Sequence, residues 1–401
     1  MKNIIPDQIE SYFEKSSFIR KMFEVGISMK KEFGAENVFD FSLGNPDVPP
    51  PKEVGESLAK QAAEVCQPLS MGYMPNAGLP AVREMLAEDL SDEQKVELTA
   101  DNIIVSCGAA GAINSFLRAV VEAGEEVICP IPFFGEYFFY VENFGAKLVP
   151  VESKDKFKLD MDAIEASISE KTRAIIINSP NNPTGQIISE KEIITLSALL
   201  TRKSNEYDRP IYLISDEPYR FLIFENAHVP PILPHYEFSL VIGSYSKSLS
   251  LAGARIGYIA TNPKMRDVAK LTQAITMTTR VLGFVNASVI AQKIILYAKG
   301  VGVDVNIYDE RRIAMAKILD EVGIKYEMPK GAFYFFPEVP DGFDDTGFVA
   351  LLQKHKILGV PGRAFGAPRF FRLSFCVDTK IIEASAPAFK KTMDDAKSIN
   401  N

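Results

Sequence analysis

Three clusters of polar residues follow apolar segments at regular intervals in the middle of the chain. Asn182 follows AIIINSPN, and Asp216 and Tyr219 follow IYLIS. Ser244 and Lys247 follow SLVIG. The clusters lie roughly 30 residues apart, which is the length of one strand–helix–strand unit. In an open α/β sheet the carboxyl ends of parallel strands form one ligand-binding edge. We therefore expect these side chains to gather at one edge.

The residue types in these clusters suit one kind of chemistry. A lysine amine can form an imine with an aldehyde, so Lys247 is a candidate covalent attachment point. A carboxylate such as Asp216 keeps a pyridine nitrogen protonated, because a nearby opposite charge favours the cationic form. Asn182 and Tyr219 can donate hydrogen bonds to the oxygen of a hydroxyl group attached to such a ring. Singly, these residues also suit a helix cap or a turn. Their order and spacing favour a site for a pyridine aldehyde.

The elements that would position these residues are short apolar segments rich in Val and Ile. Such segments are typical of strands buried on both faces. Segments with helical character lie between them, at 109–122, 134–144 and 190–203. Alternating strands and helices indicate an α/β fold with a mostly parallel sheet. The expected strands are 102–106, 126–129, 147–151, 174–178, 211–215, 240–244 and 257–260.

The two ends of the chain have a different pattern. An amphipathic segment at 307–322 contains YDERRIAMAKILDEV, and it is followed by expected strands at 331–336 and 371–375 and by a final helix. The first 45 residues contain a helical segment and then FDFSLGNPD. We predict a large domain at 46–304 and a smaller domain built from 1–45 and 305–401.

Length and composition are those of a soluble globular protein. The chain has 401 residues, of which 47% are hydrophobic and 24% charged. This length is typical of two domains. The net charge of −8 argues against nucleic acid as a partner, because phosphate binding needs a basic surface.

Targeting and metal-binding signals are weak in this sequence. The segment MKNIIPDQIE lacks the apolar centre of a signal peptide, and no apolar segment approaches the roughly 18 residues of a membrane span. We therefore expect a cytoplasmic protein that does not bind membranes. The four cysteines and three histidines are dispersed without metal-ligand spacing. We expect no metal site.

The segment SYSKSLSLAGARIGY resembles the cofactor-lysine motif of the class I/II aminotransferases, with Arg255 eight residues after Lys247. NNPTG and DEPY resemble the two preceding motifs of that family. The resemblance covers nearly the whole chain. SLGNPD, GYMPNAGLPAVRE, SCGAAGA, PIPFFGEY, VPGRAFG and RFFRLSF also occur in the family's order.

The resemblance implies a pyridoxal-5′-phosphate (PLP) enzyme of fold type I. Such a protein has a large domain with a mostly parallel seven-stranded sheet and a smaller α+β domain from both termini. It is a homodimer with shared active sites. The implied reaction is a ping-pong transfer of an amino group from an α-amino acid to a 2-oxo acid.

The resemblance also implies roles for individual residues around the cofactor. Lys247 would hold PLP as a Schiff base and transfer the proton at Cα, with Asp216 at the pyridine nitrogen. Asn182 and Tyr219 would contact the phenolic oxygen. The phosphate would be bound by Ser244, Arg255 and the helix start at Gly108, Ala109 and Ala110, with Phe134 stacked on the ring and Tyr73 reaching the neighbouring subunit's phosphate.

For the substrate, Arg372 would bind the α-carboxylate through its planar guanidinium, beside Asn182. Gly44 would let the backbone approach the substrate. Arg280, in TMTTRVLGF, is a candidate reader of a side-chain carboxylate, supplied across the dimer, and Arg363 is a second candidate. Both arginines also suit a surface or structural role.

Other functions remain as alternatives. The sequence contains no GxxxxGK[ST] loop and no GxGxxG after a strand, which argues against a nucleotide-binding enzyme. We predict an aminotransferase acting on aspartate- or alanine-type amino acids. A PLP-dependent C–S β-lyase, or another enzyme of the same fold that breaks a bond at Cα, such as a decarboxylase, shares the cofactor-binding motifs, so fold analogy does not separate these reactions. A non-catalytic PLP-binding regulator is a more remote alternative.

Overall fold

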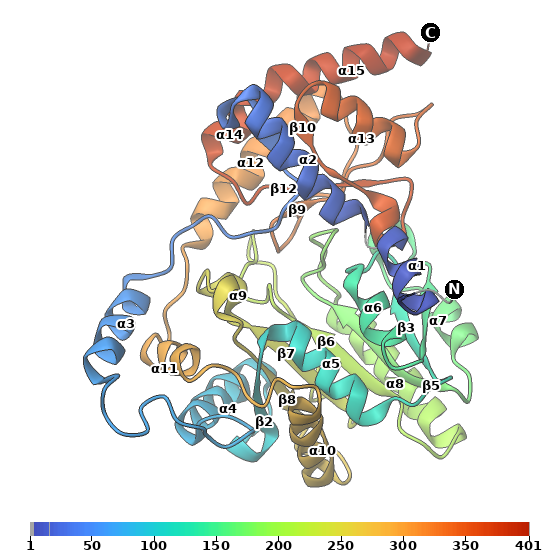
Figure 1. Ribbon diagram of the computed structural model, residues 1–401. Coiled ribbons are helices and arrows are strands. Elements are labelled where there is room, and N and C mark those ends of the chain that lie inside the picture. Colours follow the sequence, from blue (N-terminus) through green and yellow to red (C-terminus); the bar gives the residue numbers. More distant parts are fainter. Residues whose placement is uncertain (1–3, 16, 401) are drawn as a thin grey trace.

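The computed structural model describes residues 4–15 and 17–400 (Figure 1). Its centre is a seven-stranded sheet in the order β2-β8-β7-β6-β5-β3-β4, and β8 is antiparallel to both of its neighbours while the other pairs are parallel. The α/β fold with a mostly parallel seven-stranded sheet is confirmed. The strands are β2 Ile103–Ser106, β3 Glu126–Pro130, β4 Lys147–Val151, β5 Thr172–Asn178, β6 Tyr212–Asp216, β7 Ser239–Ser244 and β8 Gly257–Thr261.

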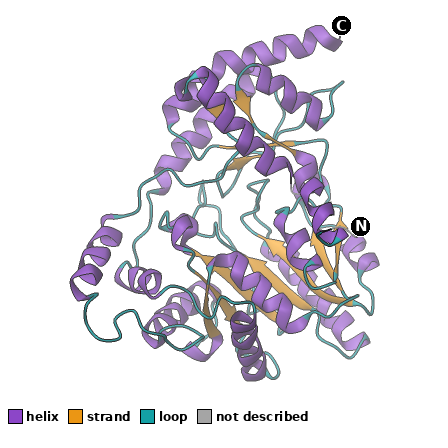
Figure 2. Cartoon of the chain, viewed as in Figure 1, coloured by secondary structure: helices purple, strands orange, loops and turns teal. Residues whose placement is uncertain are grey.

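Helices cover both faces of this sheet, as Figure 2 shows. Alternate residues of β5 enter different cores because side chains alternate across a strand. Ala174 and Ile176 pack in the core of α5 (Gly108–Val120), α6 (Glu136–Glu142) and α10 (Val268–Val281). Ile175 and Ile177 pack in the opposite core. That core includes α3 (Lys52–Glu64), α4 (Pro80–Gln94), α7 (Met161–Ser167), α8 (Glu190–Glu206) and α11 (Val289–Tyr297).

Both ends of the chain meet in the upper part of Figure 1. Strand β1 (Phe39–Asp40) pairs in parallel with β10 (Ile357–Leu358), and a second small sheet has the order β11-β12-β9. Its strands are β9 Tyr334–Phe335, β11 Val360–Pro361 and β12 Phe371–Ser374. The helices here are α2 Ser17–Phe33, α12 Val305–Val322, α13 Asp345–Lys354, α14 Thr379–Ala384 and α15 Ala386–Asn400. Helix α1 (Asp7–Lys15) lies lower in Figure 1, beside α6, where the Tyr12 ring meets Phe139 edge-on.

One predicted strand is much shorter than expected. The strand expected at 331–336 is reduced to Tyr334–Phe335. Ala332 has a φ of +56°, a left-handed conformation that interrupts extended backbone. Gly331 makes only an isolated bridge with Ile223. The sequence pattern was therefore right about the apolar core position and wrong about the strand length.

We propose that these two parts are domains with boundaries at 46–304 and at 1–45 with 305–401. The start of α12 at Val305 supports the second boundary. A separate apolar core, with Phe41, Phe335 and Phe389 fully buried, supports the joining of the two ends. Tyr219 belongs to this same core, so the proposed domains are in contact.

Neither a membrane-spanning helix nor a metal-binding cluster is present among the described residues. None of their helices is long and apolar enough to cross a membrane. Among the same residues, no three histidine, cysteine, aspartate or glutamate side chains form a group that could hold a metal ion.

Arg312 on α12 joins the proposed domains and gives a stability prediction. Its side chain is 2% exposed and bonds to Glu225 and Asp309 at 2.8 Å each and to the Pro329 carbonyl at 3.2 Å. Arg312→Met leaves that carbonyl without its donor, so we expect a loss of about 1–3 kcal/mol in unfolding free energy. Urea unfolding measures it. Lys317→Met, at an exposed position of the same helix, is the control and should change stability by less than about 0.5 kcal/mol. Equal effects of the two changes would contradict the role of Arg312.

Candidate active site

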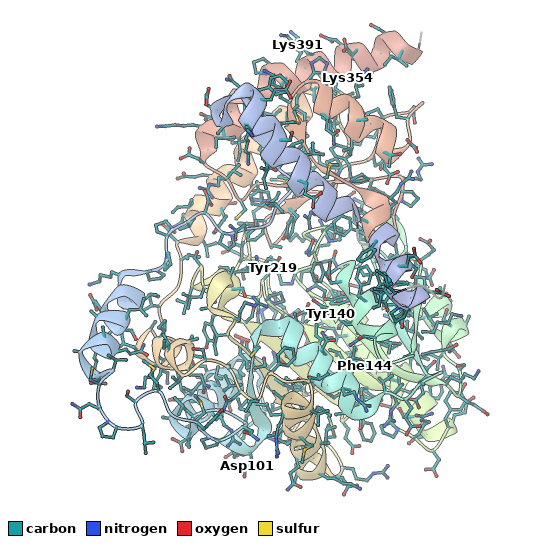
Figure 3. All side chains as sticks on the ribbon, viewed as in Figure 1. Asp101, Tyr140, Phe144, Tyr219, Lys354 and Lys391 are labelled. Carbon is teal, nitrogen blue, oxygen red and sulfur yellow. The ribbon has the colours of Figure 1, made fainter. Side chains whose placement is uncertain are left out.

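A cavity of about 350 Å³ collects most of the predicted site residues. Its walls come from the ends of β5, β6 and β7 and from the small sheet carrying β12. Figure 3 labels Tyr219 and Tyr140, two of its lining residues, between the large sheet and the upper part of the molecule. The predicted residues in this lining are Gly44, Ala109, Ala110, Phe134, Asn182, Asp216, Tyr219, Ser244, Lys247, Arg255 and Arg372.

Lys247 lies in a single helical turn, α9 (Tyr245–Ser248), directly after β7. Its Nζ donates a 2.6 Å hydrogen bond to the carbonyl oxygen of Gly44. Burial lowers the pKa of this amine to about 8, and the positive charges of Arg372 and Arg255 act in the same direction. A much larger fraction of the amine is therefore neutral at physiological pH than in a solvated lysine. A neutral amine is the nucleophilic form.

Asp216 is a buried carboxyl at the end of β6. Its Oδ2 accepts a 2.5 Å hydrogen bond from the Tyr137 hydroxyl, and among the described residues its Oδ1 has no hydrogen-bond partner. Burial raises the pKa of Asp216 to about 7, against the lowering effect of the Tyr137 bond. Buried polar atoms are nearly always paired, so Oδ1 is suited to a donor from a ligand.

Arg372 on β12 is a buried cation, 3% exposed. Its Nη1 donates to Asn182 Oδ1 at 3.0 Å and its Nη2 to the Ser42 carbonyl at 2.7 Å. The structure shows no hydrogen-bond partner for Nε and no carboxylate paired with Arg372 within the described chain. Burial lowers the pKa of this guanidinium. A buried cation without a counter-ion is suited to an anionic ligand group.

Two rings and a glycine hold Arg372 and Tyr219 in place. The Arg372 guanidinium lies 4.6 Å from the Tyr334 ring centroid and 4.9 Å from that of Phe365. The hydroxyls of Tyr219 and Tyr334 are 2.9 Å apart. A Cβ atom at Gly44 would overlap the Tyr334 hydroxyl, so this position requires glycine.

The far end of the cavity is suited to an anion. Helix α5 begins at Gly108, whose φ is +73°, and its first turn contains Ala109 and Ala110. A Cβ at Gly108 would lie 2.7 Å from Nη2 of Arg255, so the guanidinium lies over this helix start. Free backbone N–H groups and an arginine at a helix N-terminus form an anion site. Ser244 lines the same cavity.

Three predicted candidates lie elsewhere in this chain. Tyr73 is 98% exposed. Arg280 is exposed in the last turn of α10 and does not line the cavity. Arg363 bonds to Asp345 through Nε at 2.8 Å and to Asp344 at 2.9 Å, so its charge is compensated. The roles of Tyr73 and Arg280 toward a second subunit stay predictions.

Three residues that support the site, Tyr137, Asn178 and Tyr334, were not among those predicted from the sequence. Tyr137 lies one helical turn after Phe134, and that spacing was the available signal. Asn178 ends β5 directly opposite Asp216, donates to the Asp216 carbonyl at 2.7 Å and accepts from the Asn182 backbone at 2.6 Å. Tyr334 lies in the apolar segment expected as a strand at 331–336, and nothing in the sequence indicates that its hydroxyl makes a polar contact in the site.

The groups in the cavity fit PLP. A buried carboxylate oxygen without a partner suits a protonated pyridine nitrogen, and an amine whose neutral fraction is much larger than that of a solvated lysine suits the aldehyde. The helix start beside Arg255 suits the phosphate. Phe134 lines the cavity as an aromatic wall, its ring edge-to-face with Tyr137 at 5.6 Å.

Comparisons with known proteins identify the family. Residues 36–388 match the family described as aminotransferase class I and II. A probable aspartate aminotransferase from Methanocaldococcus jannaschii is 30% identical over 95% of this chain and 98% of its own. An aspartate aminotransferase from Pyrococcus horikoshii is 33% identical over 92% of this chain and 93% of its own.

Solved structures agree with this match. The crystal structure of an amino transferase from Eubacterium rectale has a TM-score of 0.93 and 37% identity, covering 98% of this chain and 99% of that one. An aspartate aminotransferase from Thermotoga maritima has a TM-score of 0.83 and 27% identity, covering 94% and 96%. This chain therefore belongs to the class I and II aminotransferases, which are PLP-dependent transferases.

Proposed function

We propose that this cavity binds PLP and transfers an amino group from an aspartate- or alanine-type amino acid to a 2-oxo acid by a ping-pong mechanism. The observation that carries the proposal is one cavity lined by a buried amine, a buried carboxyl and a buried guanidinium, Lys247, Asp216 and Arg372. Relatives named aspartate aminotransferase support the substrate class.

The cofactor end of the site follows from charge and hydrogen bonding. When bound, PLP supplies an aldehyde for an amine and an electron-accepting ring. Asp216 keeps the ring nitrogen protonated through Oδ1. Asn182 Oδ1 accepts a hydrogen bond from Arg372, so the Asn182 Nδ2 is left to donate to the phenolic oxygen of the cofactor. Tyr219 donates to the same oxygen. Ser244, Arg255 and the start of α5 hold the phosphate.

Lys247 has two tasks in this proposal. Its amine first binds the cofactor covalently. Once displaced by an incoming amino acid, the same amine would be free to accept the proton from the substrate Cα as a general base. A pKa of about 8 suits both tasks, because general acid–base groups act best near the working pH.

The substrate end uses Arg372 and a second subunit. Arg372 binds the α-carboxylate through its planar guanidinium, oriented by the Ser42 carbonyl and Asn182. We propose a homodimer in which Tyr73 and Arg280 reach the neighbouring site. The exposure of Tyr73 and the nearby apolar Leu69, 98% and 90%, supports a covered surface there. The cytoplasmic location stays a prediction.

The first test removes the covalent attachment point. Lys247→Ala should abolish borohydride trapping of PLP and lower kcat by at least about 100-fold, because it removes both the attachment and the general base. Mass spectrometry of the trapped protein and steady-state rates with aspartate measure these effects. Lys264→Ala, at an exposed lysine, is the control. Trapping that persists in Lys247→Ala would disprove the assignment.

The same lysine gives a pH dependence. Because only the deprotonated amine reacts, covalent capture of PLP by the cofactor-free protein should speed up as pH rises toward about 8 and level off above it. A rate that keeps rising to pH 10 would mean an ordinary lysine. Stopped-flow absorbance follows the capture.

The second test concerns the α-carboxylate. Arg372→Lys keeps the charge and loses the planar fork, so KM should rise by about 10-fold or more for every amino acid tested. Steady-state kinetics with aspartate, glutamate and alanine measure it. An unchanged KM for all three would remove Arg372 from this role.

The third test concerns side-chain selection. Arg280→Ala should raise KM for aspartate and glutamate by about 10-fold and leave KM for alanine within about 2-fold, because alanine has no side-chain charge. Equal effects on the three substrates would show that Arg280 does not read the side chain. Cysteine-type substrates serve as a further comparison, since release of pyruvate and ammonia from them would favour the lyase alternative.

A further inference from the structure

We propose that Tyr137 is a positioning residue that fixes the Asp216 carboxylate so that one oxygen faces the cofactor ring nitrogen. The inference rests on the proposed role of Asp216 in binding PLP. It adds a residue to the site that acts through Asp216 and does not itself touch the reacting atoms.

The geometry of the pair is specific. Tyr137 lies in α6 and is 1% exposed, and its hydroxyl donates to Asp216 Oδ2 at 2.5 Å. In the sequence, Tyr137 precedes β5 and Asp216 follows it, 79 positions later. A carboxylate held at one oxygen cannot rotate freely. The other oxygen, Oδ1, has no hydrogen-bond partner in the described residues and belongs to a residue lining the cavity.

The phenol of Tyr137 is the donor in this bond. Burial and the Asp216 charge raise the pKa of Tyr137 well above its ordinary value, so the hydroxyl keeps its proton. The bond acts in the opposite direction on its partner and lowers the pKa of Asp216. Tyr137 thereby favours the charged carboxylate that a protonated ring nitrogen requires.

The other ionisable groups coupled electrostatically to Asp216 do not replace this bond. Glu217 raises the pKa of Asp216, and its own carboxylate bonds to Ser215 at 2.7 Å and Arg220 at 2.9 Å. Buried Cys129 keeps its thiol proton, because burial raises its pKa well above the ordinary value. Among the described residues, Tyr137 is therefore the side chain that hydrogen-bonds to the Asp216 carboxylate.

Tyr137 also contacts the aromatic wall of the cavity. Its ring meets Phe134 edge-to-face, with 5.6 Å between centroids and an interplanar angle of 87°. One side chain thus supports both the carboxylate proposed for the ring nitrogen and the ring proposed to stack on the cofactor.

The test compares Tyr137→Phe with the wild type. The change removes only the hydroxyl, and we expect the PLP dissociation constant to rise by about 10-fold or more, the size expected for a hydrogen bond to a charged group. We expect kcat to fall with little change in KM for the amino acid, and the absorbance of bound PLP to shift. Cofactor titration followed by absorbance measures affinity and spectrum directly.

A matched control separates positioning from stability. Tyr236 is another buried tyrosine, and its hydroxyl bonds to the Ile211 carbonyl at 2.7 Å and lies 2.9 Å from Ser204 Oγ, outside the cavity. Tyr236→Phe should lower thermal stability and leave PLP affinity and absorbance unchanged. If the two variants affect the cofactor equally, Tyr137 has only a structural role and the inference is wrong.

A double-mutant cycle with Asp216→Asn completes the test. If Tyr137 acts through the carboxylate, Tyr137→Phe should change PLP affinity by less than about 2-fold in the Asp216→Asn background. An equal effect in both backgrounds would overturn the inference. Failure of the proposed function is distinguishable, because the wild type would then not bind PLP or Asp216→Asn would not weaken its binding.

Discussion

The structure depends on keeping three ionisable groups, Lys247, Asp216 and Arg372, buried around one cavity without full complements of protein partners. Burial opposes the charged form of any group whose protein partners do not fully replace its lost solvation. It moves the pKa of Lys247 down to about 8 and that of Asp216 up to about 7. The pKa values of the Lys247 amine and the Asp216 carboxyl, which ordinarily lie well above and well below neutral pH, are thereby both brought close to it. Perturbed groups gathered in one cavity are a feature of catalytic sites.

The two parts of the chain hold opposite ends of this arrangement. The parallel strands β5, β6 and β7 end beside one another, so their last residues are fixed by backbone pairing. Arg372 and Gly44 come from the small sheet and the segment after β1. Asp47, in that same segment, makes a two-point ion pair with Arg311 of α12 at 2.6 and 2.8 Å. The carbonyl that accepts from Lys247 is thereby attached to the proposed small domain.

The seven strands and the cavity residues at the strand ends could be predicted from local pattern, whereas Gly44, Ala109, Ala110, Phe134, Arg255 and Arg372 were indicated only by the family resemblance. A strand buried on both faces is continuously apolar, and a polar residue at its end stands out. The signal for Tyr137 is its position one helical turn after Phe134, and Tyr334 leaves no such mark. Their partners, Asp216 and Tyr219, lie 79 and 115 residues away, and a tyrosine inside an apolar segment has the pattern of a core residue. The strand length at 331–336 failed for another reason, the backbone angle at Ala332, which the side-chain pattern does not encode.

Charge within the cavity also limits which substrates one chain can select alone. The cations among its lining residues are Lys247, Arg255 and Arg372, and the proposed roles occupy each of them. Arg363 is compensated by Asp344 and Asp345. A second substrate carboxylate would therefore need a cation from outside this lining, since desolvating an unpaired carboxylate is strongly unfavourable. An alanine side chain has no such need. On this argument the proposed homodimer would select acidic substrates through a residue such as Arg280, while Arg372 of the single chain would bind the α-carboxylate.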